Sequence, residues 1–172
     1  MADSVAALDG RRAPRDGQGE GISVVAEDAT LFDEPGFLIA RLAVQLNRGA
    51  NAALAEANLR IRSYSVLAVV CDAADGVTQR RVSTVVDLDP SQIVPIVDEL
   101  EDAGLLRRTQ DPADRRNRLL VPTAEGHQVR ARARELIESA HGPALASLRT
   151  ADGERLLALL RGLVLADIPP AG

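Results

Sequence analysis

The chain has 172 residues, a formal net charge of -5 and 46% hydrophobic residues, which predicts one soluble domain with enough apolar side chains for a core. It shows no apolar run of membrane-spanning length and no apolar signal core near its N-terminus, so we expect a cytoplasmic protein without membrane partners. A single cysteine excludes an intrachain disulfide. Two separated histidines give no metal-ligand cluster, and we expect neither a metal nor another cofactor.

The first thirty residues contain many Gly, Asp and Ala residues and little apolar periodicity before Ile22. They predict a flexible N-terminal arm, residues 1–30, followed by a folded domain, residues 31–167, and a short tail, residues 168–172. Within the domain, apolar residues recur at helical spacing over 31–58, and after a break at 59–62 a second apolar helix is predicted over 64–74.

A short helix and a turn are predicted between Thr78 and Leu88. Propensity alone favours a strand over 82–86, because this segment is rich in β-branched residues. The capped helix that follows favours a helix-turn-helix instead, with Asp87 in the turn at positive φ.

The segment 89–103 carries explicit helix signals. Asp89 is a good N-cap, Pro90 suits the first helical position, and Gln92 stands where a capping box has its third residue. Glycine at position 104 suits the helix end. Ile93, Ile96, Val97 and Leu100 share one face, so the helix has one buried side and one presented side.

A basic hairpin follows the capped helix. It consists of an apolar strand at 105–106, an arginine-rich turn at 111–118 and a second apolar strand at 119–121. The segment from Arg107 to Arg134 contains eight arginines and three acidic residues, so its local net charge is +5 although the whole chain is acidic. Phosphate binding depends on local charge, so the overall acidity does not exclude a nucleic-acid partner.

Two further helices are predicted at 123–140 and 150–166, separated by Gly142 and Pro143. The last helix has an unusually broad apolar surface, which pairing with a second copy of the chain would bury.

These residues resemble the MarR family of winged helix-turn-helix transcriptional regulators. The resemblance rests on the segment 91–108, on the wing sequence Asp-Pro-Ala-Asp-Arg-Arg-Asn-Arg at 111–118, and on Thr-Ala-Glu-Gly at 123–126. It implies a mainly α fold with a small β-hairpin wing, a DNA-binding lobe over 63–122, and dimerisation helices over 31–58 and 123–167. It also implies a homodimeric repressor of a near-palindromic operator, with half-sites roughly 34 to 36 Å apart, released by an aromatic or phenolic effector.

The resemblance assigns roles to the wing. Arg116 is the minor-groove residue, Asp114 holds its guanidinium, and Arg115 and Arg118 contact phosphates. The alternative is a solvated charged turn, but the preceding capped helix favours the functional interpretation.

On the lobe itself, Arg80, Ser91 and Gln92 are candidate DNA contacts. Val94 and Pro95 depart from the family pattern, which often has polar base readers here; they could contact thymine methyl groups. Proline at this point also removes one helical hydrogen bond.

An effector pocket implied by the family would draw on Arg41, Gln45, Arg48, Tyr64 and His127. Each also has a structural interpretation, as a solvated helix face, a core residue or a cap. Cys71, mid-way along an apolar helix, is more typical of a small hydrophobe than of a redox sensor.

Two other classes of function remain for this sequence. An enzyme would need a nucleophile beside a base, and only Ser139 with His141, or Cys71 with His127, offer this without a supporting motif, so we expect no catalysis. A winged-helix module for protein contacts without sequence-specific DNA binding is the stronger alternative, because Val94 and Pro95 make the presented helix less polar.

Overall fold

The computed structural model describes residues 30–169, in which six α- or 3-10 helices precede the β2–β3 hairpin and two helices follow it. In chain order the elements are η1 (Thr30–Asp33), α2 (Pro35–Leu54), η2 (Ala55–Ala57), α3 (Ile61–Asp72), β1 (Val77–Thr78), α4 (Gln79–Val86), α5 (Pro90–Asp102), β2 (Leu106–Gln110), β3 (Arg118–Pro122), α6 (Ala124–Leu145) and α7 (Thr150–Leu165). The mainly helical fold with a β-hairpin wing confirms the predicted class.

Two compact units divide between Ala40 and Arg41. In the described part of the first unit, the rings of Phe32 and Phe37 meet edge to face with centroids 5.6 Å apart. The predicted arm at 1–30 lies outside the described residues except for Thr30, and the predicted domain limits stay predictions.

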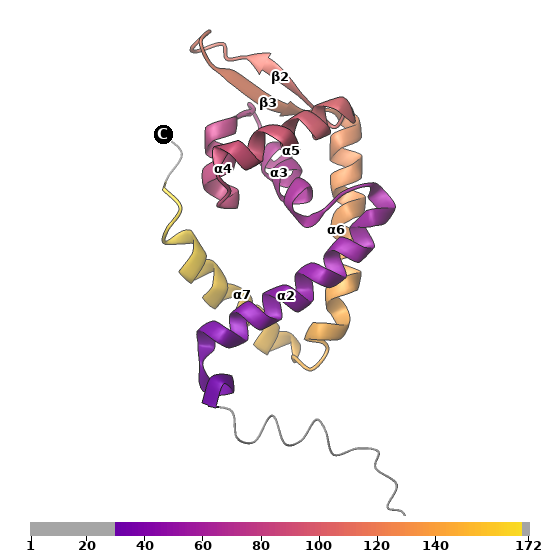
Figure 1. Ribbon diagram of the computed structural model, residues 1–172, viewed down its shortest axis with the longest axis vertical. Coiled ribbons are helices and arrows are strands. Elements are labelled where there is room, and N and C mark those ends of the chain that lie inside the picture. The colour runs from indigo at the N-terminus through magenta and orange to yellow at the C-terminus, as the bar shows by residue number, and fades with distance from the viewer. Residues whose placement is uncertain (1–29, 170–172) are drawn as a thin grey trace, which may run out of the picture. The chain divides into compact units, whose positions relative to one another are not determined.

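The core of the second unit lies where α3 packs against α4, α5 and α6. Its fully buried side chains come from the apolar faces that the sequence periodicity marks: Leu54, Val66, Leu67, Val70, Val82, Ile93, Val97, Leu100, Leu106 and Leu120. Figure 1 shows the β2–β3 hairpin extending beyond α4 and α5. The core therefore supports both the presented helix and the base of the hairpin.

The sheet has three antiparallel strands in the order β1-β3-β2. Val77 pairs with Leu120 and Thr78 with Leu119, while β2 pairs with β3 from Leu106 opposite Pro122 to Gln110 opposite Arg118. The sequence predicted only two strands, because a two-residue strand has too little pattern to be seen without its partner.

Several predicted helix limits were wrong. The first predicted helix, 31–58, is divided into η1, α2 and η2, and it ends at Asn58, which has a φ of 52°. Helix α3 begins at Ile61, three residues before the predicted start. Helix α6 continues through Gly142 and Pro143 to Leu145, because a proline so near the helix end removes only one hydrogen bond.

The helix-turn-helix prediction is confirmed. Segment 79–86 is helical despite its β-branched residues, and Thr78 caps it by accepting a hydrogen bond from the Arg81 N–H at 3.2 Å. Asp87 takes the left-handed conformation, with a φ of 51°. Buried Ser83 donates its hydroxyl hydrogen to the Leu88 carbonyl at 2.5 Å, which ties α4 to the turn before α5.

Candidate nucleic-acid interface

The presented helix α5 begins at Pro90 with Asp89 as its N-cap, as the sequence predicts, but within the described residues the Gln92 side chain does not complete the predicted capping box. A carboxylate oxygen of Asp89 accepts a hydrogen bond from the Ser91 N–H at 2.8 Å, and Pro90 occupies the first turn. Hydrogen bonds from the Ser91 side chain and main chain lower the pKa of Asp89. The cap is therefore a carboxylate at neutral pH, as the positive end of a helix favours.

The two sides of α5 differ sharply in exposure. Ile93, Val97 and Leu100 are buried in the core. The opposite side presents four of the predicted DNA contacts, all of them exposed: Ser91, Gln92, Val94 and Pro95. With 44% of its surface accessible, Val94 is among the exposed large apolar residues. A bulky apolar side chain beside two polar ones can meet both thymine methyl groups and polar base edges.

The wing tip is closed by a hydrogen bond from the Asp111 N–H to the Asn117 carbonyl, 3.1 Å long. The carboxylate of Asp114 accepts hydrogen bonds from the main-chain N–H of Arg116 at 3.0 Å and from the Asn117 amide at 3.3 Å. The sequence interpretation had this carboxylate holding the Arg116 guanidinium; within the described residues it holds the main chain instead. Asp114 thus shapes the turn and leaves the guanidinium free.

Unpaired positive charge is concentrated in the wing. Three arginines counted in the local balance are engaged in ion pairs within the described residues: Arg108 with Asp98 and Glu101, Arg130 with Asp72, and Arg134 with Glu138. Arg115, Arg116 and Arg118 have no ion pair in that part of the chain and are exposed, as is Arg80 on α4. The wing and α4 therefore hold exposed arginines that remain available for phosphates.

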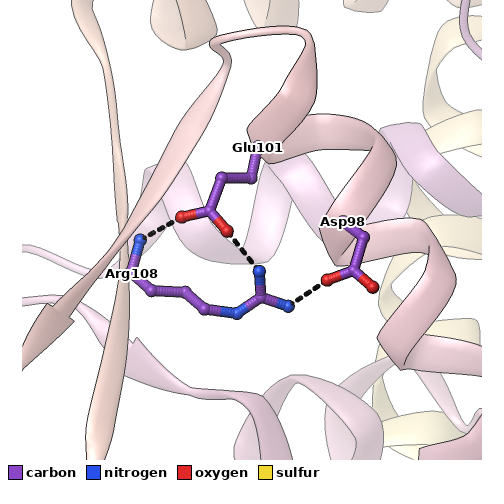
Figure 2. Close-up of polar contacts among 3 residues, drawn as sticks. All are labelled: Asp98, Glu101 and Arg108. Atoms are coloured by element: carbon purple, nitrogen blue, oxygen red, sulfur yellow. Dashed lines mark hydrogen bonds and ion pairs between the residues drawn. The ribbon is translucent and has the colours of Figure 1, made fainter.

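Arg108 links the base of the wing to α5. Its main-chain N–H donates to one oxygen of Glu101 at 2.8 Å, and its guanidinium binds the other oxygen of Glu101 and, at 2.5 Å, an oxygen of Asp98 (Figure 2). The sequence interpretation missed this cluster, because seven to ten positions separate its members across a helix end and a strand.

The wing is also tied to α6, at the Thr-x-x-Gly sequence. The hydroxyl of Thr123 accepts a hydrogen bond from the Gly126 N–H at 3.0 Å and donates to the Gly104 carbonyl at 2.7 Å. The Thr123 N–H donates to the Leu105 carbonyl at 3.1 Å. Buried Gly126 packs so closely against that carbonyl that a side chain would collide with it. This explains why both Thr123 and Gly126 carry part of the family resemblance.

The predicted effector residues are not gathered around one described cavity. Arg41, Gln45, Arg48 and His127 are exposed, and half-buried Tyr64 packs against the core. A hollow of about 240 Å³ is lined instead by Asn47, Ile61, Arg62, Ser65, Val86 and Leu88. Its polar lining comes from residues that no sequence motif singled out.

The catalytic pairs considered from sequence gain no support from the geometry. Ser139 and His141 stand two residues apart in α6, and positions with that separation point to different sides of a helix. Cys71 is half-buried, and burial raises the pKa of its thiol, which disfavours the reactive thiolate at neutral pH. Within residues 30–169, no helix combines the length and apolar character needed to cross a membrane.

Comparison with known proteins places this lobe in a family. Residues 58–117 match the model of the MarR family. A regulator of this family from Rhodococcus sp. RHA1 is 39% identical in sequence, with a TM-score of 0.74 over 80% of this chain and 98% of that one. The chain belongs to the MarR family. It is a DNA-binding transcriptional regulator, and its partners are those of the family, double-stranded DNA and a second copy of the chain.

Other relatives of this MarR-family chain have more specific descriptions. CouR from Rhodococcus jostii RHA1, bound to p-coumaroyl-CoA, is 40% identical, with a TM-score of 0.73 over 85% of this chain and 99% of that one. A repressor also named CouR, bound to a 23-mer DNA duplex, is 29% identical, with a TM-score of 0.68 over 78% and 94% of the two chains. A transcriptional regulatory protein assigned to the hcr operon of Thauera aromatica is 30% identical over 77% of this chain and 84% of its own length.

Proposed function

We propose that this MarR-family regulator is a homodimeric repressor of a near-palindromic operator, released by an aromatic or phenolic effector. One observation carries the DNA-binding part of the proposal. A capped helix with an exposed face and a hairpin with unpaired arginines lie on one lobe and are joined through Arg108. The CouR repressor held on a 23-mer duplex supports the same use of the lobe.

In this proposal α5 and the wing contact different grooves of the DNA. Helix α5 enters the major groove, where Ser91 and Gln92 contact polar base edges and Val94 and Pro95 contact thymine methyl groups. Arg116 enters the adjacent minor groove, where the negative potential favours a guanidinium, while Arg115 and Arg118 bind phosphates. Arg80 adds a further contact from α4.

Exposed apolar side chains support the dimer. Helix α7 leaves Leu157, Leu159, Leu163, Val164 and Leu165 between 50% and 67% exposed. One terminal helix of a monomer would not keep so much apolar surface in water. Pairing with a second copy buries this surface. The two-fold symmetry of the resulting dimer matches a near-palindromic operator.

The effector part of the proposal rests on CouR, whose structure holds p-coumaroyl-CoA. A phenolic acyl thioester combines an aromatic ring with a large anionic carrier. This makes p-coumaroyl-CoA the first compound to test, with p-coumarate and free coenzyme A as matched controls for the two halves. The expected result is loss of operator binding with the thioester at concentrations where neither control acts.

Selection from a random DNA library tests the core of the proposal. The purified protein, shown by light scattering to be dimeric, is selected at physiological salt, and an inverted repeat with half-sites one helical turn apart is the expected outcome. Binding should also weaken as salt rises, with a slope near -0.9 for each phosphate contact. No enrichment from folded, dimeric protein would favour the protein-contact module, for which exposed Val94 and Pro95 are the supporting observation.

A further inference from the structure

Arg108 makes a bridge whose geometry goes beyond a surface ion pair. It lies in β2 opposite Leu120, and its two carboxylate partners, Asp98 and Glu101, lie one turn apart on α5. Figure 2 shows the guanidinium spanning the two carboxylates while the main-chain N–H of the same residue binds the far oxygen of Glu101. One residue thus fixes both the strand and its side chain to the helix.

The chemistry of the cluster suits a fixed joint. Only 21% of the Arg108 side chain is exposed, against 53% for Asp98 and 34% for Glu101. Partial burial opposes the charge of Arg108, but the hydrogen bonds with Asp98 and Glu101 outweigh it and raise its pKa. The planar guanidinium can bind two carboxylates at once, whereas an ammonium group lacks that fork.

The position of the cluster connects it to the wing. The paired part of β2 runs from Leu106 to Gln110, and the tip begins directly after it. Gln110 donates its amide hydrogen to the Arg115 carbonyl at 3.1 Å, so the tip continues from a strand already held at Arg108. The guanidinium of Arg108 is held by the carboxylates of Asp98 and Glu101, so it is engaged within the lobe and not directed to phosphates.

We propose that Arg108 is a positioning residue for DNA binding, which sets the wing arginines at the distance from α5 that lets both elements contact one operator. This rests on the proposed DNA-binding function. Asp98 and Glu101 then aid binding of a polyanion although they are acidic, because they hold Arg108 in place.

A double-mutant cycle tests the proposal on the duplex enriched by selection. Arg108→Ala alone should weaken binding about tenfold, since residues that share a contact network couple strongly. In an Arg116→Ala background the same change should cost less than about twofold, because the wing arginine is already lost. Equal fold losses in both backgrounds would overturn the proposal, since they would show that Arg108 does not act through the wing.

Substitution of an acidic partner tests the direction in which the DNA affinity changes, and this test does not depend on Arg108→Ala being folded. Glu101→Gln removes a negative charge from the DNA-binding lobe, so electrostatics alone predicts tighter binding. The positioning role predicts that Glu101→Gln binds DNA about threefold more weakly. It also predicts that Arg108→Lys binds more weakly than the original chain. Tighter binding by Glu101→Gln, or full activity of Arg108→Lys, would contradict the proposal.

A matched control distinguishes the Arg108 cluster from an ordinary surface ion pair. Arg134 on α6 pairs with Glu138 at 2.7 Å, and Arg134→Ala should leave affinity unchanged. Thermal unfolding of each variant shows that the compared proteins are folded at the assay temperature. If the original chain binds no DNA at all, the proposed function fails; if it binds and Arg108→Ala binds equally well, only this inference fails.

Discussion

Substitution of Gly126 by alanine should destabilise the protein severely. A Cβ at this position would overlap the carbonyl oxygen of Leu105 and would lie 3.0 Å from its carbonyl carbon. The obstacle is main chain, which cannot rotate away as a flexible side chain can. That same carbonyl accepts a hydrogen bond from the N–H of Thr123 at 3.1 Å and shares, at 3.2 Å, the hydroxyl hydrogen that Thr123 donates to the Gly104 carbonyl. Any shift that relieves the clash therefore strains or breaks the junction between the wing and α6.

The magnitude follows from these contacts. Overpacking of a buried site costs about 1 to 3 kcal/mol, and each weakened hydrogen bond adds about 1 kcal/mol. Gly126→Ala should therefore lower the free energy of unfolding by about 3 to 5 kcal/mol, or the Tm by about 6 to 20 °C at this chain length. Thermal and urea unfolding measure this, at one fixed protein concentration because the protein is a dimer.

Gly142→Ala is the matched control in the same helix. Nothing lies within 4 Å of a Cβ added at Gly142. Alanine there should stabilise the helix by about 0.5 to 1 kcal/mol, because glycine loses more backbone entropy on folding. Equal stabilities of the two variants would refute the argument that Gly126 is required by close main-chain packing.

Four further predictions concern the DNA-binding lobe. Arg116→Ala should weaken operator binding about tenfold or more, with light scattering still showing a dimer; unchanged affinity would remove the wing from the mechanism. Thr123→Ala should lower the free energy of unfolding by about 1 to 2 kcal/mol, whereas Thr123→Ser, which keeps the hydroxyl, should not. If Val94 contacts a thymine methyl group, replacing that thymine by uracil should weaken binding about fourfold, from about 0.8 kcal/mol for one buried methyl, and Val94→Ala should lose this sensitivity. The main-chain N–H of Arg108 lowers the pKa of Glu101 in the folded protein. The stability that Glu101 contributes is therefore present above its unfolded pKa of about 4.3, and it is lost as the pH falls through the folded-state pKa. The stability difference between the original chain and Glu101→Gln, measured by urea unfolding across pH, should therefore close in acid; a difference that persists there would show another origin.

Local signals in the sequence predicted most of the lobe. The cap at Asp89, the turn at Asp87 and the buried face of α5 each depend on residues within one or two helical turns of one another. Such features can be read without knowing the fold, and all three were confirmed.

Features that depend on distant partners were missed. Strand β1 has two residues and exists through its pairing with Leu119 and Leu120, more than forty positions later. The bridge at Arg108 needs the angle between α5 and β2, which no periodicity encodes. The prediction that α6 stops before Pro143 failed for the opposite reason, because this local signal costs the helix only one hydrogen bond near its end.

The wing tip is closed by local hydrogen bonds. Besides the links across its base, from Asp111 to Asn117 and from the Gln110 amide to the Arg115 carbonyl, its side-chain bonds within the described residues join neighbours, such as Asp111 with Ala113 and Asp114 with Arg116. Segment 111–117 is therefore a modular loop that could be grafted from one relative to another without repacking the core. Through such exchanges, the DNA preference that we propose for the wing could diverge during evolution while α5 stays the same.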